Sequence, residues 1–385
     1  MFRNDTFARF AALPLLLCAV VLYLAASTAV AAAESSGKSF YDVADDHWAY
    51  GAVQDMIGNG IIDGYDDGSF HPDDPLTREQ FAKLLTLALD EPLQPAAEAT
   101  FSDVSPDMWS YLYIETVKPY LEGYTLPIGK PFFEPGALLT REDVAVALVK
   151  SMKLRTDGVD ARSIVESSLT DYGDISPGLD LYVAVALQNG LIEGYPDGTF
   201  KPHDGLNRAA AATLLGRLLQ SPAMPKLKEI ELTVNAPPSA DRPSIQISGT
   251  VAKEAKLTLY GKDVPHNGSF TIPLDFPNGD GDYTLEFRAV KPNGRYRTVV
   301  KHVRFAIPEP KLTAEAPASS ERQKVTVKGT VSDINDANPV VRVNDEQVNV
   351  AAGGTWSKEV SLDEGDNAII ITAANVYDKT FAMEK

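Results

Sequence analysis

The sequence predicts a multidomain protein in which a repetitive α-helical region is followed by two all-β sandwiches. A turn-rich stretch that begins at Gly64 recurs from Gly194 and, more loosely, from Gly123. From Ile230 the apolar residues change from the spacing of one helix face to the alternation of strands, and after Pro308-Glu309-Pro310 the strand pattern starts again. The 385 residues leave room for several domains, and an apolar fraction of 44% is typical of folded chains.

Residues 1–33 are predicted to be a signal peptide. Arg3 and Arg9 precede an apolar run over residues 10–26, and small residues up to Ala33 offer cleavage sites. A transmembrane anchor is the alternative, but Pro14 interrupts the run and no stop-transfer charges follow it. We therefore expect export with cleavage and no membrane insertion afterwards.

The single cysteine, Cys18, lies inside this apolar run. After cleavage the chain would have no thiol, which excludes disulfides, cysteine-based zinc sites and cysteine nucleophiles. The five histidines show no metal-ligand spacing, so we expect no metal and no cofactor.

The charge is concentrated in the repetitive region. Residues 34–222 hold 13 basic against 30 acidic side chains, a net charge of −17, whereas residues 223–385 hold 20 against 22. Such a field repels nucleic acid and anionic lipid, so neither is an expected partner. An anionic ligand of this region would have to be held by local contacts.

The repetitive region divides into three helix–loop–helix units, at 38–95, 99–156 and 167–222. In the first unit Asn59-Gly60 is expected to end one helix, and Thr77 with Gln80 is a capping pair that starts the next. Thr140 with Asp143 repeats this pair in the second unit, whose loop is longer around residues 127–131, and Asn207 is the cap in the third. One such unit cannot bury its apolar face alone, so three should pack together.

These residues resemble a known family. The opening Phe40-Tyr41-Asp42, the pair Trp48-Ala49, the loop from Gly64 and the helix start Thr77-Arg78-Glu79 are similar to the motifs of the S-layer homology (SLH) domain. The resemblance implies an all-α bundle of three repeats with three-fold pseudosymmetry and grooves between the repeats. It also implies non-covalent attachment to secondary cell-wall polysaccharide, commonly through pyruvylated sugar ends.

The resemblance further implies which residues bind the glycan. They are the arginines Arg78, Arg141 and Arg208, the aspartates Asp42, Asp103 and Asp171, the tryptophans Trp48 and Trp109, and the loop residues Gly64, Tyr65, Gly194 and Tyr195. The third repeat has Gly178 instead of tryptophan, and Asn207 and Ala209 instead of threonine and glutamate. We therefore expect the three grooves to be unequal.

The same residue types suit this chemistry without the family. A pyruvyl ketal carries a carboxylate, which an arginine fork at a helix start can bind with two parallel hydrogen bonds. An exposed tryptophan could cover a sugar face, and Gly64 or Gly194 would let the backbone approach the sugar ring. Each residue type also has a structural interpretation: the aspartates as caps of the turn before the first helix, the tryptophans as core residues, and the arginines as partners of carboxylates.

Residues 226–308 and 311–385 are predicted to be two copies of one sandwich. Segments 247–251, 268–270 and 285–289 match segments 327–331, 354–356 and 369–373. The second copy is similar to bacterial Ig-like modules, which implies a spacer or a module with surface-protein or glycan partners. Trp356 is predicted to lie in its core.

Together these patterns favour a secreted bacterial surface protein that is attached to the wall by its helical region. We expect a binding protein and not an enzyme, because no nucleophile and base, or acid and base, stand at a defined spacing. Two alternatives stay open: an accessory protein whose sandwiches bind or cleave glycans, and a structural protein that assembles an S-layer lattice.

Overall fold

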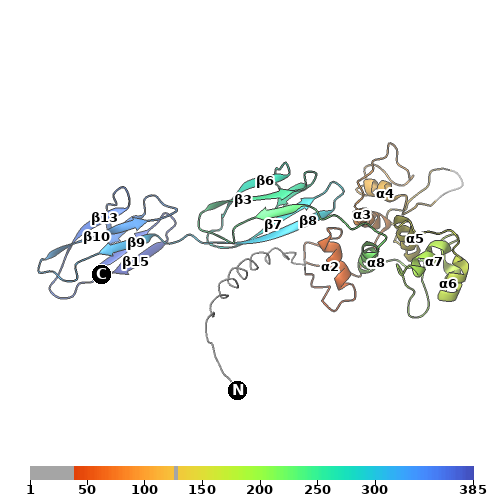
Figure 1. Cartoon of the computed structure of the whole chain (residues 1–385), viewed down its shortest axis with the longest axis horizontal. Helices are drawn as coiled ribbons and strands as arrows, with labels where there is room; N and C mark the ends of the chain where they lie inside the picture. The colour runs from red at the N-terminus through yellow and green to blue at the C-terminus, as the bar shows by residue number, and fades with distance from the viewer. Residues whose placement is uncertain (1–38, 125–128) are drawn as a thin grey trace, which may run out of the picture. The chain divides into compact units, whose positions relative to one another are not determined.

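The computed structural model describes residues 39–124 and 129–385. The predicted signal peptide with Cys18, and residues 125–128 of the enlarged loop in the second repeat, lie outside the described residues. Three separate hydrophobic cores follow each other along the chain, formed by buried residues at 40–218, 230–307 and 312–373 (Figure 1). Within the described part of the chain, none of the helices has the length and apolarity needed to cross a membrane.

The first core is built from helices. Those in the described residues are α2 (Tyr50–Gly58), α3 (Arg78–Leu89), α4 (Tyr111–Val117), α5 (Arg141–Ser151), α6 (Ala161–Ser168), α7 (Asp180–Gln188) and α8 (Arg208–Gln220), with a short 3₁₀ turn at Tyr172–Asp174. Helix α6 was not expected from the sequence. It lies between the second and third predicted units, is capped by Asp160, and packs Ala161, Ile164 and the buried Val165 against the core.

The predicted caps are confirmed. Thr77 accepts a hydrogen bond from the Gln80 backbone N–H, and the Gln80 side chain accepts one from the Thr77 N–H, which completes a capping box at α3. Thr140 and Asp143 form the same box at α5. Asn207 caps α8 by accepting from the Ala210 N–H at 2.8 Å.

A closed ring of backbone hydrogen bonds joins the segments that lead into α3, α5 and α8. The N–H of Leu76 donates to the carbonyl of Leu206, Leu206 donates to Leu139, and Leu139 donates to Leu76, each at 2.9 Å. All three leucines are buried. Because each of the three helices begins two residues after one of these leucines, the ring brings their N-termini together.

An aspartate fixes each of the three loops. In the first repeat the two carboxylate oxygens of Asp42 accept from the consecutive N–H groups of Phe70 and His71, both at 2.8 Å. The equivalent sets, all at 2.7 Å, are Asp103 with Phe133 and Glu134, and Asp171 with Phe200 and Lys201. His71, Glu134 and Lys201 have φ values of 56°, 56° and 53°, a left-handed conformation that costs free energy in non-glycine residues. The charge-assisted hydrogen bonds offset that cost.

The second and third cores lie in two β-sandwiches. The first has the strands β1 (Leu232–Asn235), β2 (Ser239–Ala240), β3 (Ser244–Val251), β4 (Lys256–Leu259), β5 (Lys262–Asp263), β6 (Ser269–Asp275), β7 (Gly281–Val290) and β8 (Tyr296–Phe305). The second has β9 (Lys311–Glu315), β10 (Lys324–Ser332), β11 (Val340–Val343), β12 (Glu346–Val348), β13 (Thr355–Ser361), β14 (Ile370–Ala374) and β15 (Thr380–Glu384).

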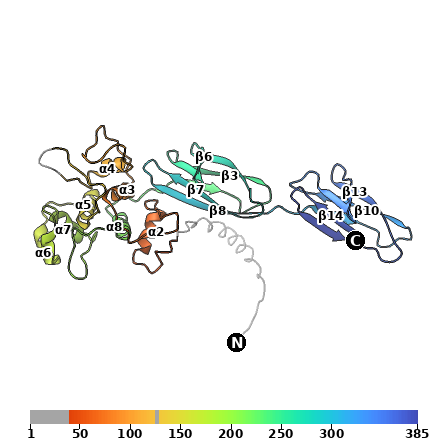
Figure 2. The same ribbon diagram turned by 180° about the vertical axis from the view of Figure 1, so that it is seen from behind.

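Each sandwich packs two sheets over its core. The sheet orders are β1-β3-β6 with β2-β8-β7-β4-β5 in the first sandwich, and β13-β10-β9 with β12-β11-β14-β15 in the second. Figure 2 shows β14 of one sheet of the second sandwich together with β10 and β13 of the other. All neighbouring strands are antiparallel except β2 and β8.

The two sandwiches share a detail that the sequence match anticipated. Gly249 pairs with Phe270 in the first sandwich, and Gly329 pairs with Trp356 in the second. A Cβ atom on either glycine would lie within 2 Å of a backbone oxygen on the neighbouring strand, so only glycine fits. Trp356 is 4% exposed, which confirms its predicted place in the core.

We predict that Asp42→Ala lowers the free energy of unfolding of the helical region by about 2–4 kcal/mol, because two charge-assisted hydrogen bonds to a strained loop are lost. Urea unfolding followed by far-UV circular dichroism measures this. Asp66→Ala, in the exposed part of the same loop, is the matched control. Equal unfolding midpoints for the two variants would contradict a stabilising role of the two Asp42 hydrogen bonds.

Candidate functional site

Each of the three arginines at the helix starts reaches into the loop of the next repeat. Arg141 donates from Nε to the carbonyl of Phe200 and from Nη2 to the carbonyl of Glu193, both at 2.7 Å. Its guanidinium also lies over the ring of Tyr195, 4.6 Å from the ring centre. The equivalent contacts are Arg78 with the carbonyls of Phe133 and Glu122, and Arg208 with those of Phe70 and Asp63.

Arg78 differs from the other two in its exposure. Its side chain is 1% exposed, and Nη1 forms an ion pair of 2.5 Å with Asp143. The Tyr124 ring lies 5.0 Å from its guanidinium carbon. The expectation that Arg78 touches a ligand is therefore corrected: this arginine joins the first two repeats and has no open side.

Arg141 and Arg208 are only partly buried. Burial is the main cause that lowers their pKa below the usual arginine value, and nearby acidic groups oppose it. Both remain cationic at neutral pH. The position that Asp143 occupies beside Arg78 is Ala210 in the third repeat, which brings no carboxylate to Arg141.

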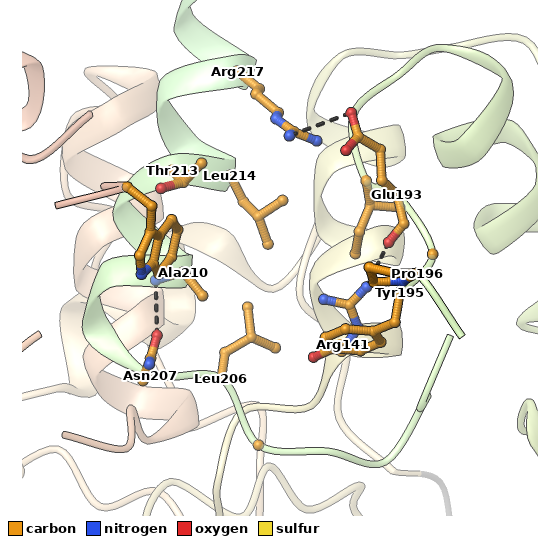
Figure 3. A pocket seen from close by; sticks show the side chains of 14 residues that line it. Arg141, Glu193, Tyr195, Pro196, Leu206, Asn207, Ala210, Thr213, Leu214 and Arg217 are labelled. Carbon is orange, nitrogen blue, oxygen red and sulfur yellow. Dashed lines mark hydrogen bonds and ion pairs between the residues drawn. The ribbon is translucent and has the colours of Figure 1, made fainter. Parts of the chain in front are cut away.

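A groove with a volume of about 380 Å³ opens beside Arg141 (Figure 3). The residues that line it are Trp48, Arg141, Ile192, Glu193, Gly194, Tyr195, Pro196, Gly205, Leu206, Asn207, Ala210, Thr213, Leu214 and Arg217. In Figure 3 Arg141, Glu193 and Tyr195 stand opposite Asn207, Ala210 and Thr213, and Leu206 and Leu214 point into the space between. At one end Arg217 pairs with Glu193 at 3.4 Å.

The two tryptophans lie on the surface. Trp48 is 63% exposed and lines this groove, and Trp109 is 54% exposed. The interpretation of both as core residues is wrong, because their neighbours Ala49 and Ser110 take the buried positions. Their exposed indole faces are available to a ligand.

The aspartates and glycines of the candidate list have structural partners. Both carboxylate oxygens of Asp42, Asp103 and Asp171 are held by loop N–H groups about thirty residues away in the chain, and not by the turn before the first helix. A Cβ on Gly64 would lie 2.0 Å from the Phe40 ring. The predicted purpose of Gly64 is thus corrected, since it makes room for a core side chain. Gly194 is less tightly surrounded and lines the groove.

Sequence reasoning missed several groove residues, above all Glu193 and Arg217. A signal for Arg217 was present, because it is the only charged side chain after Arg208 in helix α8. Glu193 is recognisable only once the Arg141 contact places it. No group of three or more His, Cys, Asp or Glu side chains that could hold a metal ion occurs among the residues that the structure describes.

Comparison with known families agrees with the repeated elements. The model of the S-layer homology domain matches residues 39–82 and 168–212, the first and third repeats. The chain carries S-layer homology domains. The intervening repeat shares its capping box with the first repeat, and it shares the aspartate hydrogen bonds to the loop and the arginine contacts with both. Residues 310–383 match the model of glucodextranase domain B, which supports an Ig-like assignment of the second sandwich.

Several curated proteins are similar to parts of this chain. S-layer protein EA1 of Bacillus anthracis is 28% identical over 47% of the chain and 20% of its own length. The surface-layer 125 kDa protein of Lysinibacillus sphaericus is 26% identical over 58% and 19%. Amylopullulanase of Thermoanaerobacterium thermosulfurigenes is 27% identical over 48% and 10%. The chain thus spans about a fifth or less of the length of these relatives.

Among solved structures, the fibronectin(III)-like modules of Clostridium thermocellum CbhA align with 40% of this chain and 91% of their own chain. The sequence identity is 19% and the TM-score is 0.18. The SLH domains together with the surface-layer relatives indicate a secreted protein of the cell surface.

We predict that Arg78→Ala costs about 3–5 kcal/mol of unfolding free energy, because Asp143 and two loop carbonyls lose a buried partner. Arg208→Ala, at a partly exposed position, should cost clearly less. Urea unfolding of both variants tests this ranking. A milder effect of Arg78→Ala than of Arg208→Ala would show that the buried arginine is not the main link between repeats.

Proposed function

We propose that the helical region anchors this protein non-covalently to the bacterial cell wall by binding an acidic, pyruvylated end of secondary cell-wall polysaccharide. The observation that carries the proposal is the groove in which Arg141 and Arg217 lie beside the exposed Trp48. The matched SLH domains and the surface-layer relatives support attachment at the cell surface.

The groove offers three kinds of contact to such a sugar. Arg141 is positioned by two loop carbonyls and partly desolvated, so its attraction to a carboxylate is stronger than in water. Arg217 could exchange Glu193, an exposed partner, for the ligand carboxylate. Trp48 supplies an exposed apolar surface for a sugar face, and the largely buried Leu206 and Leu214 line the groove below it. A volume of about 380 Å³ lies within the range of small-ligand sites.

We propose further that the three repeats form a bundle with three-fold pseudosymmetry. Two observations support this arrangement. Backbone hydrogen bonds join Leu76, Leu139 and Leu206 in a ring, and each arginine donates to carbonyls in the loop of the next repeat. The grooves are nevertheless unequal. The one at Arg78 is closed by Asp143, and the third repeat offers it Gly178 in place of a tryptophan.

The two sandwiches are proposed to be spacer or interaction modules with surface-protein or glycan partners. We propose a binding protein and not an enzyme, although the relatives include an amylopullulanase and the exoglucanase XynX of Acetivibrio thermocellus. Hydrolysis of wall or storage glycans by the purified chain would overturn this part.

Assembly into a lattice is the second candidate function, since the relatives EA1 and the 125 kDa protein carry surface-layer names. Light scattering at rising protein concentration, with and without calcium, distinguishes it. A monomer under all conditions would rule out self-assembly of this chain alone.

We predict that Arg141→Ala and Trp48→Ala weaken binding of the full chain to purified sacculi at least about tenfold, a loss of about 1.4 kcal/mol each, because the cation or the stacking surface is removed. Arg217→Ala should weaken it less. Cosedimentation with native and pyruvyl-free sacculi is the measurement.

The matched control is Arg162→Ala, whose side chain forms an exposed ion pair with Glu166 within α6. It should bind native sacculi as the wild type does. Retention of Arg141→Ala and Trp48→Ala at the wild-type level, or equal binding to pyruvyl-free sacculi, would refute the carboxylate groove.

A further inference from the structure

The hairpin between β7 and β8 of the first sandwich contacts the first SLH repeat. The Tyr296 hydroxyl donates to the carbonyl of Ile62 at 2.8 Å, and the Tyr296 N–H donates to the carbonyl of Gly60 at 3.2 Å. A Cβ on Gly60 would lie 1.7 Å from the Tyr296 carbonyl oxygen. The two segments therefore approach at backbone distance, and Tyr296 is buried.

A charged cluster at the end of α3 fixes the hairpin turn. Asp90 accepts from Lys291 at 2.7 and 2.8 Å and from Asn293 at 3.1 Å, and it pairs with Arg295 at 3.0 Å. Arg295 also donates to the carbonyl of Asn59 at 3.0 Å. Burial raises the pKa of Asp90, but these hydrogen bonds and charges outweigh it and hold the pKa below its usual value. Asn293 and Arg295 are 3% and 2% exposed.

The place of this contact follows from the equivalence of the repeats. Gly64 and Gly194, like Arg78 and Arg208, are 130 residues apart, so Asp63 corresponds to Glu193 and Leu87 corresponds to Arg217. In the open groove Glu193 pairs with Arg217. In the groove formed by Arg208 and Tyr65, the last turn of α3 has only the apolar Leu87 at the position of that cation.

The sandwich adds an arginine at this end of the groove, where Lys83 of α3 also interacts electrostatically with Asp63. Arg288, on β7, pairs with Asp63 at 2.8 Å and lies over the Tyr296 ring at 3.6 Å. A Cβ on Gly294 would lie 3.7 Å from Leu87 and 3.0 Å from the Tyr113 hydroxyl, so the turn rests on that end of the groove. The groove at Arg78 has its own pair, Lys150 with Glu122 at 2.5 Å. At the groove of Arg208, the arginine that pairs with Asp63 comes from the first sandwich.

We propose that the β7–β8 hairpin is an intramolecular plug of the groove between the third and first repeats. The docked chain then presents one complete glycan groove, the one at Arg141. In the groove at Arg208 the side chains of Tyr65 and Trp109 are exposed, but the hairpin occupies the end at Asp63 and Leu87, so that its release completes a second binding site there. The ligand of the exposed groove rests on the proposed function, but the docking of the hairpin does not. The first sandwich is by this account a part of the anchor and not a free spacer.

Asp90→Lys is the variant that releases the plug. It places a third cation against Lys291 and Arg295, so the docked state is repelled. The fold should tolerate it, because Asp90 has a φ of 52° at a helix C-terminus, where a cation is favourable, and Lys153 and Lys201 adopt the same conformation here. The matched control is Asp280→Lys, at the exposed pair with Lys379.

Two measurements on the full chain test the plug. Hydrogen exchange at the amide of Tyr296 should become at least about tenfold faster in Asp90→Lys and stay unchanged in Asp280→Lys, because the bond to Gly60 is lost only in the former. Calorimetric titration with the methyl glycoside of a pyruvylated hexosamine should give one site in the wild type and two in Asp90→Lys. Adding Arg208→Ala to Asp90→Lys should restore one site.

The outcomes separate the plug from the proposed function. Unchanged exchange in Asp90→Lys overturns the plug whatever the ligand is. Faster exchange with a single site in both proteins also overturns it, since the released groove would not bind. Faster exchange with no binding by either protein confirms the docked hairpin and refutes the proposed ligand instead.

Discussion

The helical region depends on one interaction, the arginine fork that each repeat lays on two backbone carbonyls of the next loop. Loop carbonyls at a tight turn lack regular partners, and a guanidinium with its donors in a fixed plane satisfies two at once. In the same loop, an aspartate such as Asp42 accepts hydrogen bonds from two consecutive backbone N–H groups. Because this contact both joins the repeats and forms the groove wall, cohesion and ligand recognition use the same side chains.

A small difference beside each arginine decides what it can do. Asp143 forms an ion pair with Arg78, whose side chain is shielded from solvent, whereas Ala210 leaves room for a ligand beside Arg141. The closed groove contributes stability and the open one contributes a cationic surface. In a region with a net charge of −17, an anion can be held only where such a cation is locally exposed and already positioned.

The first sandwich takes part in the same arrangement. Its hairpin brings Arg288 to Asp63 and lays Tyr296 against Gly60, at the end of the remaining groove. Buried polar groups such as Arg295 and Asn293 are costly to bury unless they are paired, and here Asp90 pairs both. Because these polar groups are satisfied only when the hairpin of the first sandwich meets Asp90 of the helical region, the contact is specific.

The sequence by itself determined the elements that depend on neighbours in the chain. The caps at Thr77, Thr140 and Asn207, the helix end at Gly60 and the two matching sandwiches are local or periodic features, and they could be predicted. Only the tertiary structure decided which of the three arginines is buried and paired and which stays open to a ligand, and only it decided that Trp48 is exposed. Asp143 shows the reason: its capping of α5 is set three residues away, but its ion pair with Arg78 exists only once two repeats have packed.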